Sequence, residues 1–159
     1  MMHFHFSAAT PEDFDRLFEL RLIIMRESLE RIGRFDPQRA RERFSNSYRP
    51  ACTRLINIKE QLAGCVALGL EQDHLLLEHF YLAPEFQGCG LGSAVLSNLL
   101  CEAQQQNKSV RLSVLQQSHA ARFYEKHGFQ KTGEDEWDVY YEYFPKNLSQ
   151  SRNNQRTNV

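Results

Sequence analysis

The sequence lacks the long apolar segments that place a chain across a membrane. No apolar run approaches the roughly 18 residues that a membrane-spanning helix needs, so we expect neither an integral membrane protein nor a membrane partner. The first residues, Met1–Phe6, contain no basic region and no long apolar stretch, so they are not typical of a signal peptide. These absences predict a cytoplasmic protein.

Motifs for metal or redox chemistry are also missing. The four cysteines, at 52, 65, 89 and 101, include no Cys-x-x-Cys pair, and the six histidines include no His-Glu-x-x-His motif. We therefore expect free thiols and no metal site. Because each cysteine lies in an apolar or glycine-rich stretch, most of the four thiols are expected to be buried.

The charges show no strong excess of either sign, with 19 Lys and Arg residues against 20 Asp and Glu residues. Three of the basic residues lie in a polar tail at 145–159, so the rest of the chain is mildly acidic. Such a balance gives no electrostatic reason to bind nucleic acid. The tail is rich in Asn, Gln, Ser and Arg, which predicts disorder.

Core-forming residues are abundant: eleven Phe, six Tyr and 42% hydrophobic residues in a chain of 159. This content predicts one domain over residues 3–144. Thr10-Pro11 and Asp36-Pro37 are each typical of a helix start. Hydrophobic periodicity predicts helices at about 11–32, 37–48, 90–106 and 118–127, and strands at about 3–8, 53–59, 61–70, 75–82, 110–115, 129–132 and 137–144.

The order of these elements is β-α-α-β-β-β-α-β-α-β-β, which is neither a strict βαβα alternation nor an all-β pattern. It favours a mixed α/β (α+β) fold in which helices cover both faces of one sheet. The strand at 75–82 is the most densely apolar and is expected to be central in that sheet.

A glycine-rich turn joins this strand to the next helix. Such a junction offers unpaired backbone N–H groups and the positive end of a helix dipole, and glycines let a phosphate approach closely. The pattern favours a phosphate or pyrophosphate site, with a plain turn as the alternative. Without Gly-Lys-Ser/Thr it is not a nucleoside-triphosphate loop, and Ser93 breaks the Gly-x-Gly-x-x-Gly dinucleotide pattern. The turn reads Gln87-Gly88-Cys89-Gly90-Leu91-Gly92.

Two segments resemble the GNAT superfamily of N-acetyltransferases. Residues 80–93 are similar to its acetyl-CoA signature, Gln/Arg-x-x-Gly-x-Gly/Ala after a strand that ends in Tyr-apolar-x-Pro. Residues 114–129 are similar to its segment Asn-x-x-Ala-x-x-Phe/Leu-Tyr-Glu-Lys-x-Gly-Phe, with Gln117 where Asn is usual. The resemblance covers about residues 3–144.

The resemblance implies a central, mostly antiparallel sheet of about seven strands with a splayed parallel pair, flanked by about four helices. It implies acetyl-CoA as cosubstrate, whose pantetheine arm lies in the gap of the splayed pair and bonds to the main chain of Phe80, Tyr81 and Leu82. It further implies Gln117, Ala120 and Tyr124 at the cosubstrate. The pyrophosphate would then sit on the amides of Gln87, Gly88, Cys89, Gly90, Leu91, Gly92 and Ser93. A bulky residue in place of Gly90 or Gly92 is expected to block binding.

The expected chemistry is direct attack of a primary amine on the acetyl thioester. Tyr124 stands at the family's position for the acid that protonates the departing thiolate. A base must take a proton from the amine. Glu78 is the first candidate, because a carboxylate in an otherwise apolar strand is partly desolvated; His79, whose ordinary pKa is near neutral, and a water chain are the alternatives. In a regular strand Glu78 and His79 face opposite sides, so both cannot face the substrate.

The acceptor is indicated only weakly, as a small-molecule or peptide amine. Arg21, Met25 and Arg26 are candidate acceptor contacts, and five acids within residues 134–142 would favour a cationic amine if they lie beside the acyl site. Cys89 has no paired base and is not expected to be a nucleophile. A homodimer is left open. The alternative function is a non-catalytic acyl-CoA-binding module that regulates a partner.

Overall fold

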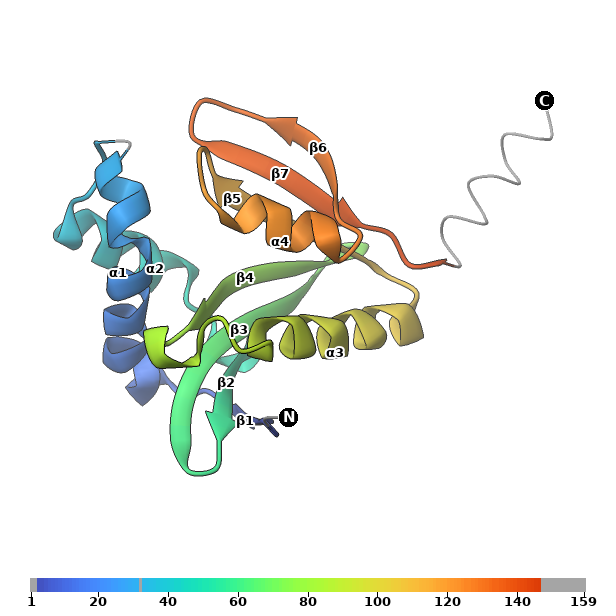
Figure 1. Ribbon diagram of the computed structural model, residues 1–159, viewed down its shortest axis with the longest axis horizontal. Helices are drawn as coiled ribbons and strands as arrows, with labels where there is room; N and C mark the ends of the chain where they lie inside the picture. Colours follow the sequence, from blue (N-terminus) through green and yellow to red (C-terminus); the bar gives the residue numbers. More distant parts are fainter. Residues whose placement is uncertain (1–2, 32, 147–159) are drawn as a thin grey trace. The chain divides into compact units, whose positions relative to one another are not determined.

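In the computed structural model, four α-helices and seven strands follow one another along residues 3–31 and 33–146, which are the residues that the structure describes (Figure 1). The helices are α1 (Phe14–Arg31), α2 (Pro37–Ser47), α3 (Leu91–Gln106) and α4 (Ala120–Lys126). The strands are β1 (His5–Ala8), β2 (Thr53–Ile58), β3 (Gln61–Glu71), β4 (His74–Leu82), β5 (Ser109–Leu115), β6 (Gln130–Glu134) and β7 (Asp138–Tyr143). This element order confirms the one predicted from periodicity.

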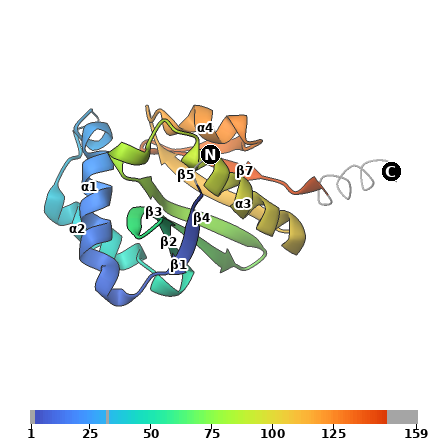
Figure 2. The same ribbon diagram turned by 60° about the horizontal axis from the view of Figure 1, so that its bottom comes forward.

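The seven strands form one sheet in the order β1-β2-β3-β4-β5-β7-β6, with β4 in the centre as predicted. β1 lies antiparallel beside β2 (Figure 2). The β4–β5 pair is parallel, and its pairing joins the first three residues of each strand, His74–Leu76 and Ser109–Arg111. The mostly antiparallel sheet with one parallel pair confirms the predicted fold class.

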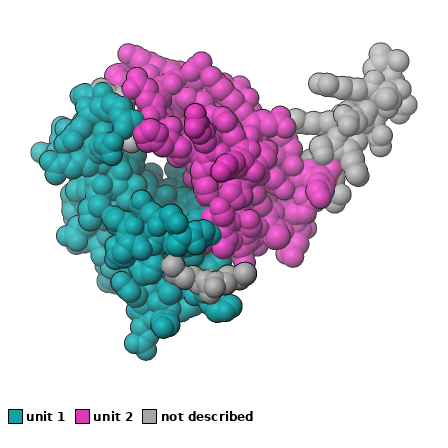
Figure 3. Space-filling model, in the orientation of Figure 1, with its two compact units in different colours: residues 1–69, 78–92 teal, residues 70–77, 93–159 magenta. Residues whose placement is uncertain are grey.

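The chain divides into two compact units (Figure 3). Unit 1 consists of residues 1–69 and 78–92, and unit 2 consists of residues 70–77 and 93–159, apart from the residues that the structure does not describe. β4 and α3 each contribute residues to both units. The expectation of a single domain over 3–144 stays a prediction, and from residue 147 the predicted disordered tail lies outside the described residues.

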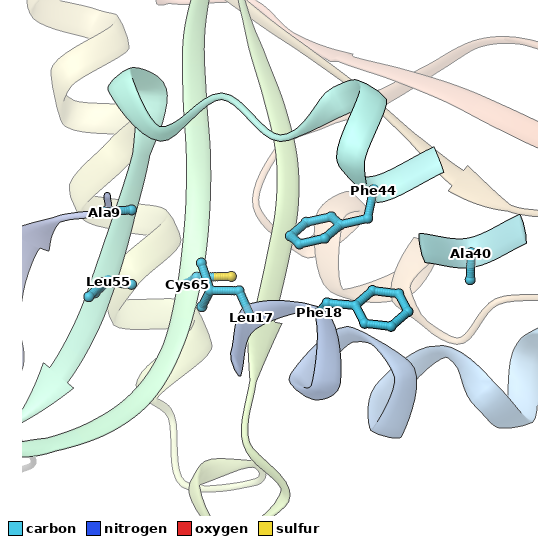
Figure 4. Packing of buried hydrophobic residues seen from close by; sticks show 7 residues of the cluster. All are labelled: Ala9, Leu17, Phe18, Ala40, Phe44, Leu55 and Cys65. Atoms are coloured by element: carbon cyan, nitrogen blue, oxygen red, sulfur yellow. The ribbon is translucent and has the colours of Figure 1, made fainter. Parts of the chain in front are cut away.

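In unit 1, the two N-terminal helices lie side by side and pack on the strands (Figure 1). The Asp36 carboxylate accepts hydrogen bonds from the backbone N–H groups of Gln38 and Arg39, which explains why α2 begins there. Tyr81 of β4 packs against their common core. Figure 4 shows that core, gathered from α1, α2, β2, β3 and the residue after β1: Ala9, Leu17, Phe18, Ala40, Phe44, Leu55 and Cys65.

In unit 2, β5, β7 and β6 form the antiparallel end of the sheet, and α4 packs against β7. The Tyr141 hydroxyl of β7 donates to the Glu125 carboxylate of α4 at 2.9 Å. Tyr124 of the same helix stacks edge-on with Phe129, at 5.5 Å between ring centroids. His119 occupies the capping position of α4, and the Ser118 hydroxyl accepts a hydrogen bond from the Ala120 N–H.

The expectation that most thiols are buried was wrong. All four are free, but only Cys65 is buried, whereas Cys52 is intermediate and Cys89 and Cys101 are exposed. Apolar neighbours in the sequence did not indicate burial, because Cys101 lies on the solvent side of α3 and Cys89 lies in the exposed glycine turn. Within residues 3–31 and 33–146, no helix is long and apolar enough to cross a membrane, and no group of three His, Cys, Asp or Glu residues is placed to hold a metal ion.

Candidate active site

The glycine turn after β4 has the backbone geometry that a close ligand approach requires. Gly88 and Gly90 have φ angles of +71° and +85°, which L side chains rarely adopt. A Cβ atom added at either position would have no neighbour within 4 Å, so the space beside the turn is open. The turn therefore leaves room for a group as large as a phosphate directly against its main chain.

Its amides are largely available for such a group. Within the described residues, the backbone N–H groups of Gly88, Cys89 and Gly90 donate to no protein acceptor, whereas that of Gln87 donates to the Pro84 carbonyl at 3.2 Å. The first backbone N–H groups of α3, which begins at Leu91, are further donors, because the first turn of a helix has no intrahelical acceptors for them. Several donors and a helix N-terminus thus converge at the exposed turn, as the anion-site prediction requires.

The main chain that leads into the turn is held by its own contacts. The Leu82 carbonyl accepts a hydrogen bond from the Gln87 side chain at 2.9 Å, and the Ala83 N–H donates to the Ala63 carbonyl at 2.8 Å. Gly64 lies against the Tyr81 carbonyl so closely that a Cβ atom there would overlap it. Phe80, Tyr81 and Leu82 are thus fixed in place by β3 and by the turn.

Glu78 lies at the middle of β4, in unit 1, and is partly buried, with 29% of its side chain exposed. Its carboxylate forms an ion pair with the Arg49 guanidinium at 3.1 Å. Sequence reasoning placed Glu78 in an apolar environment because its strand neighbours are apolar. It did not include Arg49, which reaches Glu78 from the segment that follows α2.

His79 breaks the regular strand, since its φ angle is +49°. The rule that Glu78 and His79 face opposite sides holds for a regular strand, so it does not apply at this position. The His79 imidazole has polar neighbours on both nitrogens: Nε2 lies 2.9 Å from the Ser47 hydroxyl and Nδ1 lies 3.4 Å from the Tyr81 hydroxyl. A left-handed conformation in a bulky residue is strained and is most common at functional sites.

Burial lowers the pKa of His79 to about 4, and the positive charges of Arg21 and Arg49 add to that effect. His79 is therefore neutral near pH 7 and a weaker proton acceptor than an ordinary imidazole. Burial raises the pKa of Tyr81 to about 12, so its hydroxyl stays protonated. We call the polar side chains around His79 the β4 cluster. Its members are Arg21, Ser47, Glu78, His79 and Tyr81.

Tyr124 in α4 is 8% exposed. Its ring packs edge-on against Phe123 and Phe129. Of the two adjacent aromatic residues, Tyr124 is buried and Phe123 is only partly buried. Packing thus fixes the phenol ring, and a fixed hydroxyl is what a proton donor needs.

The acids of the β6–β7 hairpin are held by local donors. Asp135 accepts from the backbone N–H groups of Trp137 and Asp138 and from the Tyr140 hydroxyl. Glu134 accepts from Gln116 and pairs with Lys131, and the buried Glu142 pairs with Arg111. Three of the five acids within residues 134–142 are thus satisfied by contacts of the protein itself.

The chain resembles known acetyltransferases over most of its length. A family model for the acetyltransferase (GNAT) domain matches residues 25–145, more than half of the chain. The chain belongs to the GNAT acetyltransferase family. The resemblance inferred from the two sequence motifs is thereby confirmed.

Individual relatives fit the same family. The chain is 30% identical over 98 residues to the ribosomal protein bS18 alanine N-acetyltransferase of Haemophilus influenzae, a match that covers 58% of this chain and 64% of that protein. It thus spans less than two thirds of that relative's length.

Two solved GNAT structures share the fold. The PaiA N-acetyltransferase of Thermoplasma acidophilum, in complex with coenzyme A, aligns with a TM-score of 0.72 at 18% identity, over 90% of this chain and 99% of that one. The ribosomal-protein-S18-alanine N-acetyltransferase of Escherichia coli aligns with a TM-score of 0.64 at 17% identity, over 89% and 94%.

Gln117, where the GNAT motif usually has Asn, has a φ angle of +64°. Asn adopts this left-handed conformation more readily than Gln, because its short side chain can bond to the nearby main chain. The departure from the motif therefore adds backbone strain but keeps a carboxamide. Ala120 is the first residue of α4, and its N–H donates to the Ser118 hydroxyl at 3.1 Å.

Proposed function

We propose that this GNAT protein transfers an acetyl group from acetyl-CoA to a primary amine of a small molecule or peptide, by direct attack of the amine. The turn at residues 87–92 carries the proposal, because it combines unpaired amides, two glycines with positive φ and open space. Family membership and a neighbour in complex with coenzyme A support it. A cytoplasmic location and a homodimer remain predictions from the sequence and the resemblance.

Acetyl-CoA would supply the activated thioester. In this proposal the amides from Gln87 to Ser93 bind its pyrophosphate, with Gly88 to Leu91 as the main donors, since the Gln87 N–H is already used within the turn. The main chain at Phe80, Tyr81 and Leu82 and the residues Gln117 and Ala120 complete the proposed cosubstrate contacts. The fit to an anion rests on the open turn, whose two positive-φ glycines leave space that a side chain would fill.

Glu78 is the proposed base, and Tyr124 is the proposed acid. The Arg49 guanidinium fixes the orientation of the Glu78 carboxylate, so that one oxygen remains to take a proton from the ammonium of the acceptor. The packed Tyr124 ring directs its hydroxyl, which would protonate the leaving sulfur. His79, whose pKa is lowered by burial to about 4, and a water chain are the alternatives for the base.

Calorimetric titration with acetyl-CoA tests the turn. Gly90→Ala is expected to weaken binding by about tenfold or more, since its methyl group would occupy the phosphate space. Gly33→Ala is a matched control, because Gly33 also has a positive φ of +70° and no neighbour within 4 Å but lies after α1. Equal loss in both variants, or no binding by the unaltered protein, would contradict the proposal.

Thiol labelling offers a second test that needs no variant. Cys89 lies in the turn and Cys101 on α3, and both are exposed. Bound acetyl-CoA should slow the modification of Cys89 and leave that of Cys101 unchanged. Equal rates at both cysteines at saturating acetyl-CoA would place the ligand elsewhere.

Tyr124→Phe separates an enzyme from a non-catalytic acyl-CoA-binding module. It removes one hydroxyl but keeps the ring packing, so turnover should fall by about tenfold or more while acetyl-CoA affinity is retained. Tyr141→Phe is the control, since it removes a hydroxyl of β7 that donates to the Glu125 carboxylate of α4. Tight binding without acetyl transfer to any amine would instead favour the binding module.

A further inference from the structure

Arg21 has a buried donor that finds no acceptor among the described residues. It projects from α1 and is partly buried, with its guanidinium carbon 5.6 Å from the centroid of the Phe44 ring. Its Nε atom is fully buried and, among the described residues, has no hydrogen-bond acceptor. A buried donor without a partner is costly, because water has been removed and nothing replaces it.

Four other arginines of α1 and α2 each form an ion pair with an acid within 3 Å, supplied by a neighbouring turn or the neighbouring helix. These pairs are Arg16–Asp13 (2.7 Å), Arg26–Glu30 (2.9 Å), Arg31–Glu27 (2.8 Å) and Arg41–Asp15 (2.7 Å). The contrast shows that acids are available along α1 and α2, yet in the described part of the chain none pairs with Arg21.

The unpaired charge lies at the β4 cluster. It acts on His79 and on Tyr81, where it helps to lower the pKa of the imidazole and opposes the rise in the pKa of the phenol. The other cation near His79, Arg49, is already paired with Glu78. One positive charge is therefore left for a ligand at the strand that carries the proposed base.

The chemistry of the guanidinium selects the ligand group. A planar guanidinium binds a carboxylate through two parallel N–H···O bonds, and such charge-assisted bonds are strong where water is excluded. A single uncompensated charge matches a carboxylate better than a dianionic phosphate, which would bring a second negative charge. We propose that the acceptor amine carries a carboxylate close to its amino group, and that Arg21 binds it; this rests on the proposed acetyltransferase function.

Matched acceptor pairs test the proposal. Each pair presents the same amine with a carboxylate or with the corresponding carboxamide: free amino acids against their amides, and the amidated peptide Ala-Asp-Ala against Ala-Asn-Ala. The unaltered protein should favour the carboxylate member by about tenfold or more in kcat/KM. Arg21→Gln should abolish this preference by raising the KM for the acid, with no change for the amide or for acetyl-CoA.

Two variants keep the result specific. Arg16→Gln removes an arginine of the same helix that already has its acid, and it should keep the preference. Arg21→Lys keeps the charge but loses the two-bond geometry, so part of the preference should remain. Equal acetylation of acid and amide by the unaltered protein would overturn the inference and leave the function intact. Acetylation of neither, without acetyl-CoA binding, would instead defeat the proposed function.

A binding readout does not depend on turnover. In ¹⁵N-labelled protein, the side-chain Nε–H signal of Arg21 is identified by its loss in Arg21→Gln. Titration with the carboxylate members should shift this signal, and the amides should leave it in place. No shift at saturating carboxylate, or a large loss of thermal stability in Arg21→Gln without ligand, would show that Arg21 is structural.

Discussion

The β4 cluster and the β6–β7 hairpin both contain many polar side chains, but they differ in how completely these side chains find hydrogen-bond partners. In the hairpin, Asp135 accepts hydrogen bonds from two backbone N–H groups and from the Tyr140 hydroxyl. Glu134 accepts a hydrogen bond from Gln116 and forms an ion pair with Lys131. In the β4 cluster, the Arg21 Nε has no acceptor in the described residues, and His79 has a strained backbone.

The difference separates polar groups that build structure from those that await a ligand. A hairpin acid that closes a turn on its own backbone lowers the free energy of the folded state. An unpaired buried donor and a left-handed histidine raise it, and such costs persist where function requires them. We therefore expect changes in the β4 cluster to affect activity, and changes in the hairpin to affect stability alone.

The largest effect is expected where the main chain of β4 is fixed. A Cβ atom at Gly64 would overlap the Tyr81 carbonyl and lie 3.0 Å from the Leu82 Cα, both of them backbone atoms that cannot turn away. Gly64→Ala should destabilise the protein by about 3 kcal/mol, measured by denaturant unfolding. Gly133→Ala in the hairpin meets only the Tyr140 ring at 3.9 Å and should cost much less. Similar losses in both variants would show that β4 is not specially constrained.

Next in size is the effect of the proposed base. Glu78→Gln keeps the shape of the side chain but cannot accept the proton, so kcat/KM should fall by about 100-fold. Glu27→Gln controls for the loss of an arginine pair, since Glu27 pairs with Arg31 on α1. A loss of activity below threefold in Glu78→Gln, with its pair to Arg49 removed, would favour a water chain as the base.

The sequence was sufficient to predict features that depend on neighbouring residues. Periodicity located the seven strands and the four α-helices of the described residues, and Asp36 marked the start of α2. The anion site at the glycine turn stays a prediction. The sequence was not sufficient for contacts between distant segments. Nothing adjacent to Glu78 indicates Arg49, and nothing adjacent to His79 indicates Ser47, because these pairs are brought together by the packing of α2 on β4.

Backbone conformation at single residues was equally out of reach. Positive φ is predictable at Gly88 and Gly90, because glycine adopts it without cost. It is not predictable at His79, whose neighbours form an ordinary apolar strand pattern. The prediction that most cysteines are buried failed for a related reason. Residues next to Cys101 in the sequence lie on other faces of the helix, so their apolar character does not predict its burial.

A smaller effect is expected from the titration of His79. Because burial lowers its pKa to about 4 from 6.5, the unfolded chain binds a proton between these values and the folded protein does not. Stability should therefore fall as the pH decreases from 6.5 towards 4, with a slope of at most about 1.4 kcal/mol per pH unit from this group. His79→Asn should reduce the slope, and Asn tolerates the left-handed backbone. His5→Asn, at an exposed position, controls for histidine removal; an unchanged slope in His79→Asn would contradict the burial argument.

The smallest effect is expected in the hairpin itself. Asp135→Asn leaves one oxygen for the two backbone N–H groups but weakens both bonds and the bond from Tyr140, because the charge is lost. The hydrogen bond from the Tyr140 hydroxyl, followed by those from the two backbone N–H groups, holds the pKa of Asp135 below its usual range. The stabilising contribution of the Asp135 carboxylate to the folded state is therefore present above pH 3.8 and is lost as the pH falls below that value. Thermal unfolding at pH 7 should show a slightly lower midpoint for the variant, smaller than the loss in Gly64→Ala. Its kcat/KM should equal that of the unaltered protein. A clear loss of acetyl transfer would mean that the hairpin acids contact the acceptor after all. The presence of local hydrogen-bond partners would then not separate structural from functional polar groups in this fold.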